Sequence, residues 1–160
     1  MAYDLTITGP ARRTVFEIKG DPSALGSDLL PPWPDRPCRL TRQDDRAFLS
    51  LGAHRWLLIA PPDHEDGLDA ALSAVHHPDA SVVLLSDSLA FFTLSGRDAD
   101  VAMSIACPLD LHPGAFGPDA CAQTDGFGVR ALVLRQGDGW LLAIEQAYAP
   151  YIAAQLAQIV

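Results

Sequence analysis

Short runs of hydrophobic or alternating residues recur along the chain and are separated by turn-forming residues, a pattern typical of β-strands. Such runs occupy residues 5–7, 15–18, 81–85 and 89–94. Residues 48–51 and 54–59 flank Gly52-Ala53, and residues 129–134 and 140–144 flank Gly137-Asp138-Gly139. Two strands that flank a short Gly-containing turn predict a β-hairpin. The sequence therefore predicts two hairpins and several further strands.

Three helices are predicted between these strands, because apolar residues recur there at intervals of three and four. The first begins with Asp63 as its N-cap, the second opens after Gly96, and the third has Pro150 in its first turn. The apolar faces expected to pack on a sheet are Leu68, Ala71, Leu72 and Val75; Val101, Ala102, Ile105 and Ala106; and Tyr148, Ile152, Leu156 and Ile159.

Hairpins followed by helices favour an α+β fold, with antiparallel or mixed sheets and helices packed on one face. A chain of 160 residues that is 49% hydrophobic has the size and the apolar content of a single domain, so we expect one domain over residues 1–160. Five prolines within residues 21–39 exclude a regular helix or central strand there. We expect that stretch to be a Pro-rich surface connection.

Charge, hydropathy and cysteine content exclude several classes of binding partner and indicate a cellular location. The formal net charge of -9 repels phosphate backbones and anionic lipid, so nucleic acid is not an expected partner. No apolar run approaches the length that a membrane span needs, and no membrane association is expected. Three widely spaced cysteines do not form a disulfide framework, which fits a reducing, cytoplasmic location.

The segment CPLDLHPGAF, residues 107–116, follows the second predicted helix and has no simple core pattern. Cys107, His112 and Cys121 lack the tight pair typical of zinc ligands, so no metal site is expected. Because Cys107 follows the C-terminus of a helix, its thiolate is disfavoured and a buried thiol is the simpler interpretation. No nucleophile elbow or phosphate loop occurs elsewhere. No catalytic residue and no bound cofactor are predicted for this chain.

Three stretches together carry a resemblance: LGAHRWLLIAPP, SDSLAFFTLSGRDADVAMSIACPLDLHPGAF and AQT. They resemble the gamma subunit of heterotetrameric sarcosine oxidase, and CPLDLHP with the following Phe is the most specific part. That subunit is similar in fold to the folate-binding domain of glycine-cleavage aminomethyltransferases, which is built from ferredoxin-like halves. The resemblance implies a noncatalytic subunit of a flavoenzyme complex that oxidatively demethylates sarcosine or a related N-methyl amino acid.

In such a complex, the resemblance implies alpha, beta and delta subunits as partners, with FAD, FMN, NAD and tetrahydrofolate on those partners. Under that interpretation, one set of residues is expected to face another chain: Trp33, Cys107, Pro108, Leu109, Asp110, Leu111, His112 and Phe116. The alternative is that Leu109, Leu111 and Phe116 fold back on the chain's own core, and that Trp33 covers the domain's own edge strand. An isolated chain that lacks its partners could pair with itself as a nonphysiological homodimer.

A different function stays open at this point: a free-standing folate-binding or one-carbon (aminomethyl) transfer protein. It requires a carboxylate placed to bond a pterin ring, for which Asp87, Asp98 and Asp110 are the candidates.

Overall fold

The structure is a computed structural model that describes residues 3–21, 25, 30–75 and 78–159. The chain divides into two compact units, unit 1 (Met1–Arg12 and Asp87–Val160) and unit 2 (Arg13–Ser86). Each unit holds one five-stranded sheet, in which every strand pairing is antiparallel. The α+β class is therefore confirmed, with antiparallel rather than mixed sheets. The expectation of a single domain over residues 1–160 stays a prediction.

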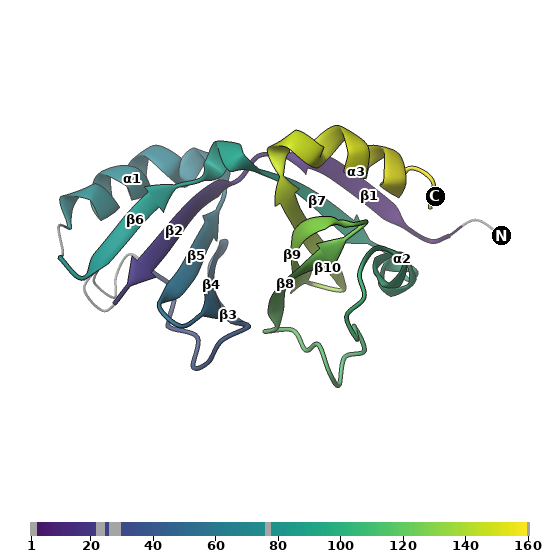
Figure 1. Ribbon diagram of the computed structural model, residues 1–160, viewed down its shortest axis with the longest axis horizontal. Coiled ribbons are helices and arrows are strands. Elements are labelled where there is room, and N and C mark those ends of the chain that lie inside the picture. Colours follow the sequence, from purple (N-terminus) through teal and green to yellow (C-terminus); the bar gives the residue numbers. More distant parts are fainter. Residues whose placement is uncertain (1–2, 22–24, 26–29, 76–77, 160) are drawn as a thin grey trace. The chain divides into compact units, whose positions relative to one another are not determined.

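Unit 2 is a sheet with one helix on one face (Figure 1). In spatial order its strands are β3 (Arg39–Gln43), β4 (Arg46–Gly52), β5 (Arg55–Ala60), β2 (Thr14–Gly20) and β6 (Ala80–Leu84). Helix α1 (Glu65–Ala74) buries Leu68 and Leu72 against the side chains of Phe16, Ile18 and Leu58. The apolar spacing read from the sequence thus placed the correct face of this helix on the core.

The start of α1 differs from the prediction. Residues Pro62–His64 form a turn of 3₁₀ helix, and His64 occupies the N-cap position without a side-chain hydrogen bond. Asp63 is therefore not the N-cap, because the fixed φ of Pro62 already begins the tighter turn one residue earlier.

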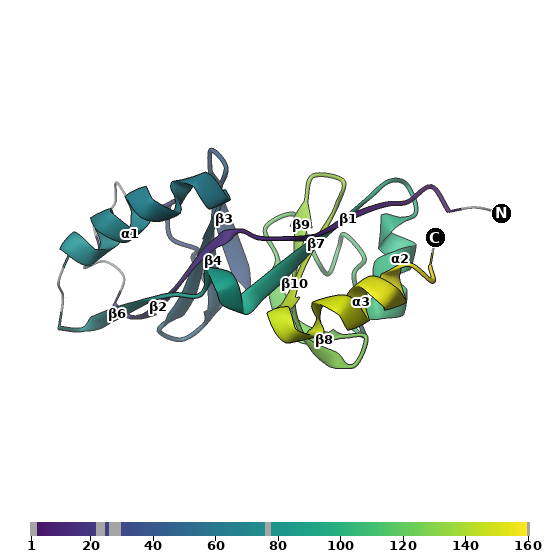
Figure 2. The same ribbon diagram turned by 90° about the horizontal axis from the view of Figure 1, so that it is seen from above.

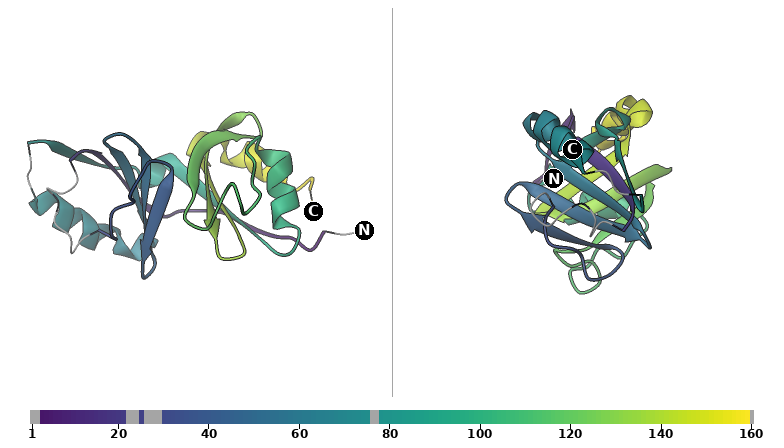
Figure 3. Two further views of the ribbon diagram at one scale, coloured as in Figure 1. Left: turned by 90° about the horizontal axis from the view of Figure 1, so that it is seen from below. Right: turned by 90° about the vertical axis from the view of Figure 1, so that its left-hand side faces the viewer.

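Unit 1 has a second sheet with two helices on one face (Figure 2). In spatial order its strands are β1 (Thr6–Ala11), β7 (Leu89–Ser95), β10 (Gly139–Glu145), β9 (Val129–Gln136) and β8 (Cys121–Gly126). Helices α2 (Ala99–Ala106) and α3 (Ala149–Leu156) add Met103, Ile152 and Leu156 to one hydrophobic cluster with Phe92 and Trp140. In Figure 3, the yellow α3 lies along the sheet of its own unit.

Helix α2 buries a different face from the one predicted. Its buried residues are Ala99, Ala102, Met103 and Ala106. Val101 and Ile105 are 46% and 57% exposed, so the predicted stripe was wrong at these two positions. The observed face also follows i, i+3, i+4, i+7 spacing, and periodicity alone does not choose between the two faces. In α3, Ile152 and Leu156 are buried as predicted, whereas Tyr148, the N-cap residue that precedes the helix, is exposed.

Two edge strands, β3 and β8, were not predicted as strands. Of the Pro-rich connection expected at residues 21–39, residues 22–24 and 26–29 lie outside the described residues. Residues 31–34 are in neither helix nor strand, and Arg39 already begins β3. Among the described residues, no helix is both long enough and apolar enough to cross a bilayer.

Candidate functional site

The 107–116 segment begins where α2 ends, and its larger apolar side chains pack inward. Cys107 is the C-cap of α2 with extended backbone, φ -137° and ψ 134°. Cys107, Leu111 and Phe116 are at most 7% exposed and belong to the core cluster of unit 1, against which Leu109 also packs. The fold-back alternative is what the structure shows for these side chains. Pro108, Asp110 and His112 remain exposed.

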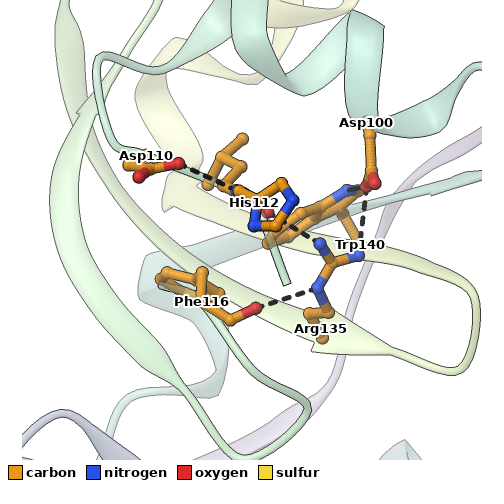
Figure 4. A network of polar contacts seen from close by, with 7 residues as sticks. Asp100, Asp110, His112, Phe116, Arg135 and Trp140 are labelled. Atoms are coloured by element: carbon orange, nitrogen blue, oxygen red, sulfur yellow. Dashed lines mark hydrogen bonds and ion pairs between the residues drawn. The ribbon is translucent and has the colours of Figure 1, made fainter. Parts of the chain in front are cut away.

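Arg135, on β9, fastens the 107–116 segment to the sheet (Figure 4). Its Nη2 donates to the carbonyl oxygen of Leu111 at 2.8 Å, and its Nε donates to that of Phe116 at 3.2 Å. Its Nη1 forms an ion pair with Asp100 Oδ1 at 3.0 Å. Only 11% of the Arg135 side chain is exposed. One guanidinium group therefore joins β9, α2 and two points of the segment. A lysine could not replace it, because its ammonium group lacks the planar arrangement of donors that makes these contacts.

Trp140 and Asp100 complete this arrangement. The fully buried Trp140 donates its indole N–H to Asp100 Oδ1 at 2.8 Å, so one carboxylate oxygen accepts from both Trp140 and Arg135. The Arg135 guanidinium carbon lies 4.1 Å from the Trp140 ring centroid, in cation–π contact. The Phe116 ring packs on Trp140 with centroids 5.4 Å apart. Arg135, Asp100 and Trp140, here called the Arg135 cluster, tie the segment to the sheet and to α2.

Asp110 and His112 shape the turn within the segment. The backbone N–H of His112 donates to Asp110 Oδ1 at 3.0 Å, and the N–H of Gly114 donates to His112 Nδ1 at 3.1 Å. The N–H groups of Ala115 and Phe116 both donate to the His112 carbonyl oxygen at 2.8 Å. His112 Nδ1 thus accepts a backbone hydrogen bond that stabilises the turn, and the imidazole is exposed whereas the Cys107 thiol is buried.

Trp33 lies in unit 2, and the 107–116 segment lies in unit 1. The Trp33 ring packs edge-on against Phe48 and Trp56, with centroids 6.1 Å and 6.0 Å apart, and is 38% exposed. Thr41 Oγ1 donates to the carbonyl oxygen of Pro32, which ties the chain beside Trp33 to β3. Trp33 therefore covers β4 and β5 of its own unit and still presents part of its ring. Its role as a partner contact stays a prediction.

Among the residues that the structure describes, no group of three or more His, Cys, Asp or Glu side chains is placed to hold a metal ion. The three candidate folate carboxylates have local contacts: Asp87 pairs with Arg12 at 2.8 Å, Asp98 accepts the backbone N–H of Asp4 at 2.7 Å, and Asp110 accepts within its own turn.

Unit 2 carries a buried charge of its own at Glu17 on β2. Arg55 Nε lies 2.7 Å from Glu17 Oε1, and Lys19 Nζ lies 3.0 Å from Oε2. Burial raises the pKa of Glu17, but the hydrogen bonds and charges of Arg55 and Lys19 together outweigh it, and the pKa lies below its ordinary value. Glu17 therefore stabilises unit 2 as a carboxylate.

Replacing Glu17 with glutamine is expected to lower the free energy of unfolding by about 1–2 kcal/mol at pH 7, because Arg55 and Lys19 lose their anionic partner. A carboxylate whose folded pKa is lowered contributes its full stability above its unfolded pKa and loses it as the pH falls through the folded pKa. The difference between wild type and Glu17→Gln, measured by urea unfolding, should therefore shrink below about pH 4.3. Glu145→Gln, at the exposed end of β10, is the control. A difference that stayed constant with pH would contradict this role.

Arg135 was missed from the sequence although a signal was present. Arg135 and Trp140 are cross-strand partners in the β9–β10 hairpin. The register of a hairpin fixes which residues lie opposite each other, so extending the predicted hairpin by one residue would have paired this arginine with the tryptophan.

The architecture defines the class first: a two-sheet α+β chain with the fold of aminomethyltransferase T. The chain superposes on glycine cleavage system aminomethyltransferase T from Bartonella henselae with a TM-score of 0.71 and 15% identity, over 97% of this chain and 46% of that protein. No protein-family model matches the chain. At this identity the likeness concerns the fold.

The more particular resemblance is to sarcosine oxidase subunit gamma. Over 93 residues, the chain is 37% identical to that subunit from Corynebacterium sp. (strain P-1) and 34% identical to the one from Arthrobacter sp.. It superposes on a chain of heterotetrameric sarcosine oxidase from Corynebacterium sp. U-96 with a TM-score of 0.80 and 23% identity, over 97% of this chain and 85% of that one. The aligned residues are 58% of this chain but 45% of each curated relative. The resemblance read from the sequence is thereby confirmed.

Proposed function

We propose that this chain is the noncatalytic gamma-type subunit of a sarcosine oxidase-like flavoenzyme complex that demethylates sarcosine or a related N-methyl amino acid. The observation that carries the proposal is the 37% identity over 93 residues to a curated gamma subunit. The fold agrees, since the superposition on the sarcosine oxidase chain includes 97% of this chain.

Within this proposal the alpha, beta and delta subunits are the partners, and they carry FAD, FMN, NAD and tetrahydrofolate in the cytoplasm. The placement of the polar residues in unit 1 supports this division. Asp110 and His112 shape a turn, Asp98 accepts a backbone N–H, and Asp100 holds Arg135 and Trp140. These side chains thus have structural roles. Pro108 and Trp33 are exposed and can contact other chains.

Coexpression with the proteins encoded beside this chain tests the proposal. A tagged chain should copurify with them in a defined stoichiometry, and the eluate should show flavin absorbance and oxidise an N-methyl amino acid. A chain that stays alone under these conditions would overturn the proposal. Calorimetry of the isolated chain with tetrahydrofolate distinguishes the free-standing folate-binding alternative, which requires measurable heat of binding.

A further inference from the structure

The two sheets end in four edge strands, and three of these are protected against further pairing. Strand β1 contains Pro10, and its register with β7 shifts between Thr8 and Ala11. Strand β3 carries Arg39 and Arg42, and β8 carries Asp125. Proline, irregular register and charge are the usual means by which natural sheets prevent another strand from adding to an edge.

Strand β6 has none of these devices. Its sequence is ASVVL, without charge or proline, and it forms the outer edge of the unit 2 sheet (Figure 1). Val83 and Leu84 are 47% and 44% exposed. Large apolar side chains on an unprotected edge are a hazard for a protein that works alone, and they suit a strand that is covered in an assembly.

The backbone groups of β6 that point away from β2 can be assigned from the pairing of these two strands. Just beyond the two ends of β6, Leu85 N–H donates to the Val15 carbonyl at 2.7 Å and Asp21 N–H donates to the Asp79 carbonyl at 3.0 Å. Hydrogen-bonded pairs alternate along an antiparallel ladder, so Ser81 and Val83 direct their backbone groups to β2. Ala80, Val82 and Leu84 then direct their N–H and C=O groups outward, a row that matches one added strand.

The acidic residues near the β6 edge indicate what kind of chain would bind there. Helix α1, which packs on β6, contains Glu65, Asp66 and Asp69 and no basic residue, and the exposed Asp79 directly precedes β6. On the neighbouring strand β2, Lys19 lies opposite Ser81, and its charge is paired with Glu17 at 3.0 Å. A second copy would bring the same acidic helix and a second net charge of -9 to the edge. A different chain with basic residues flanking an apolar strand would be attracted.

We propose that β6 is a docking edge to which another subunit of the complex adds an extended strand, with apolar side chains beside Val83 and Leu84 and lysine or arginine at its flanks. This mode of recognition combines backbone hydrogen bonds with contacts from alternate side chains. The inference rests on the proposed function, because it takes the occupant from the same complex.

Hydrogen–deuterium exchange on the coexpressed complex tests the inference with the wild-type chain. The peptide covering residues 79–86 should exchange at least tenfold more slowly in the complex than in the free chain, since the outward N–H groups of Ala80, Val82 and Leu84 gain acceptors. Unchanged exchange in a complex that has formed would overturn the docking edge and leave the proposed function intact. Failure of any complex to form would overturn both.

Two substitutions at one position separate backbone pairing from side-chain contact. Leu84→Pro removes an outward N–H without removing a hydrogen bond to β2, and proline is accepted on edge strands. It should weaken association at least tenfold, whereas Leu84→Thr, which keeps the N–H, should weaken it about threefold or less. Equal losses for both variants would contradict strand addition. Thermal unfolding of the free variants verifies that the chain remains folded.

Pairing of β6 with the same strand of a second copy of this chain would be detected by a separate measurement. If residues 79–86 of the isolated chain became protected as its concentration rose, and a dimer appeared by light scattering, β6 would pair with itself and the proposed occupant would be wrong. Added salt gives a further check, because the association of an acidic edge with a basic strand should weaken as the ionic strength rises.

Discussion

Replacing Arg135 with alanine is expected to lower the free energy of unfolding by about 3 kcal/mol, measured by urea denaturation. The substitution leaves the carbonyl oxygens of Leu111 and Phe116 without this donor, and it removes the cationic partner of Asp100. Removal of this largely buried guanidinium costs more than a typical hydrogen bond, because the two carbonyl oxygens that it bonds are left unsatisfied. The 107–116 segment should loosen at the same time and become accessible to proteases.

Arg130→Ala is the matched control, because Arg130 lies on the same strand with an exposed side chain and should change stability by less than about 0.5 kcal/mol. Arg135→Lys keeps the charge but loses the planar fork, so its effect should fall between those of wild type and Arg135→Ala. Equal stability of the Arg135→Ala and Arg130→Ala variants would show that the Arg135 cluster does not hold the segment.

A similar loss, about 3 kcal/mol or more, is expected for Gly139→Ala at the start of β10. A β-carbon at this buried position would lie 2.1 Å from the carbonyl oxygen of Leu94 and 3.1 Å from the α-carbon of Ser95. Both atoms are backbone of the paired strand β7, so the clash is relieved only by moving the central strand β10 away from β7. Thermal unfolding followed by circular dichroism measures the effect.

Gly67→Ala is the control for Gly139→Ala, because a β-carbon at Gly67 meets no atom within 4 Å and the residue lies inside α1. Alanine is favoured over glycine in a helix, so this variant should be more stable than wild type by about 0.5–1 kcal/mol. If the two substitutions had similar effects, the close approach of β10 to β7 at Gly139 would be refuted.

The elements predicted correctly are those whose local pattern and burial agree. The hairpins β4–β5 and β9–β10 combine apolar runs with short turns, and the structure pairs them as expected. Strand β3 was missed because Leu40 is its single buried side chain, so the sequence RLTRQ lacks a visible apolar face. Edge strands with few core contacts give little periodic signal.

Helix α2 shows a different limit of the sequence. Val101 and Ile105 are more hydrophobic than Ala99 and Ala102, yet the alanines face the core. Two helical faces fit the same period, and the choice between them depends on the space beside the sheet, where α2 lies against β10 with its large Trp140. Small side chains suit such a close approach, and this information is tertiary.

The 107–116 segment was identified from its unusual local sequence, but the hydrogen bonds that attach it to Arg135 were not predicted. The CPLDLHP pattern marked the segment, whereas its conformation depends on an arginine that is 24 residues from Leu111 and 19 residues from Phe116. Such contacts between distant parts of a sequence follow from strand pairing, so they become predictable only after the register of the β9–β10 hairpin is known.

The three cysteines differ in their exposure and therefore in their expected reactivity toward oxidants. Cys107 is sealed in the core of unit 1 together with the segment, and Cys121 is buried as well, whereas Cys38 of unit 2 is exposed. In the folded protein, oxidants and alkylating reagents therefore meet Cys38 first. Air oxidation would join two chains through this residue and produce a covalent dimer, which a reducing agent converts back to separate chains.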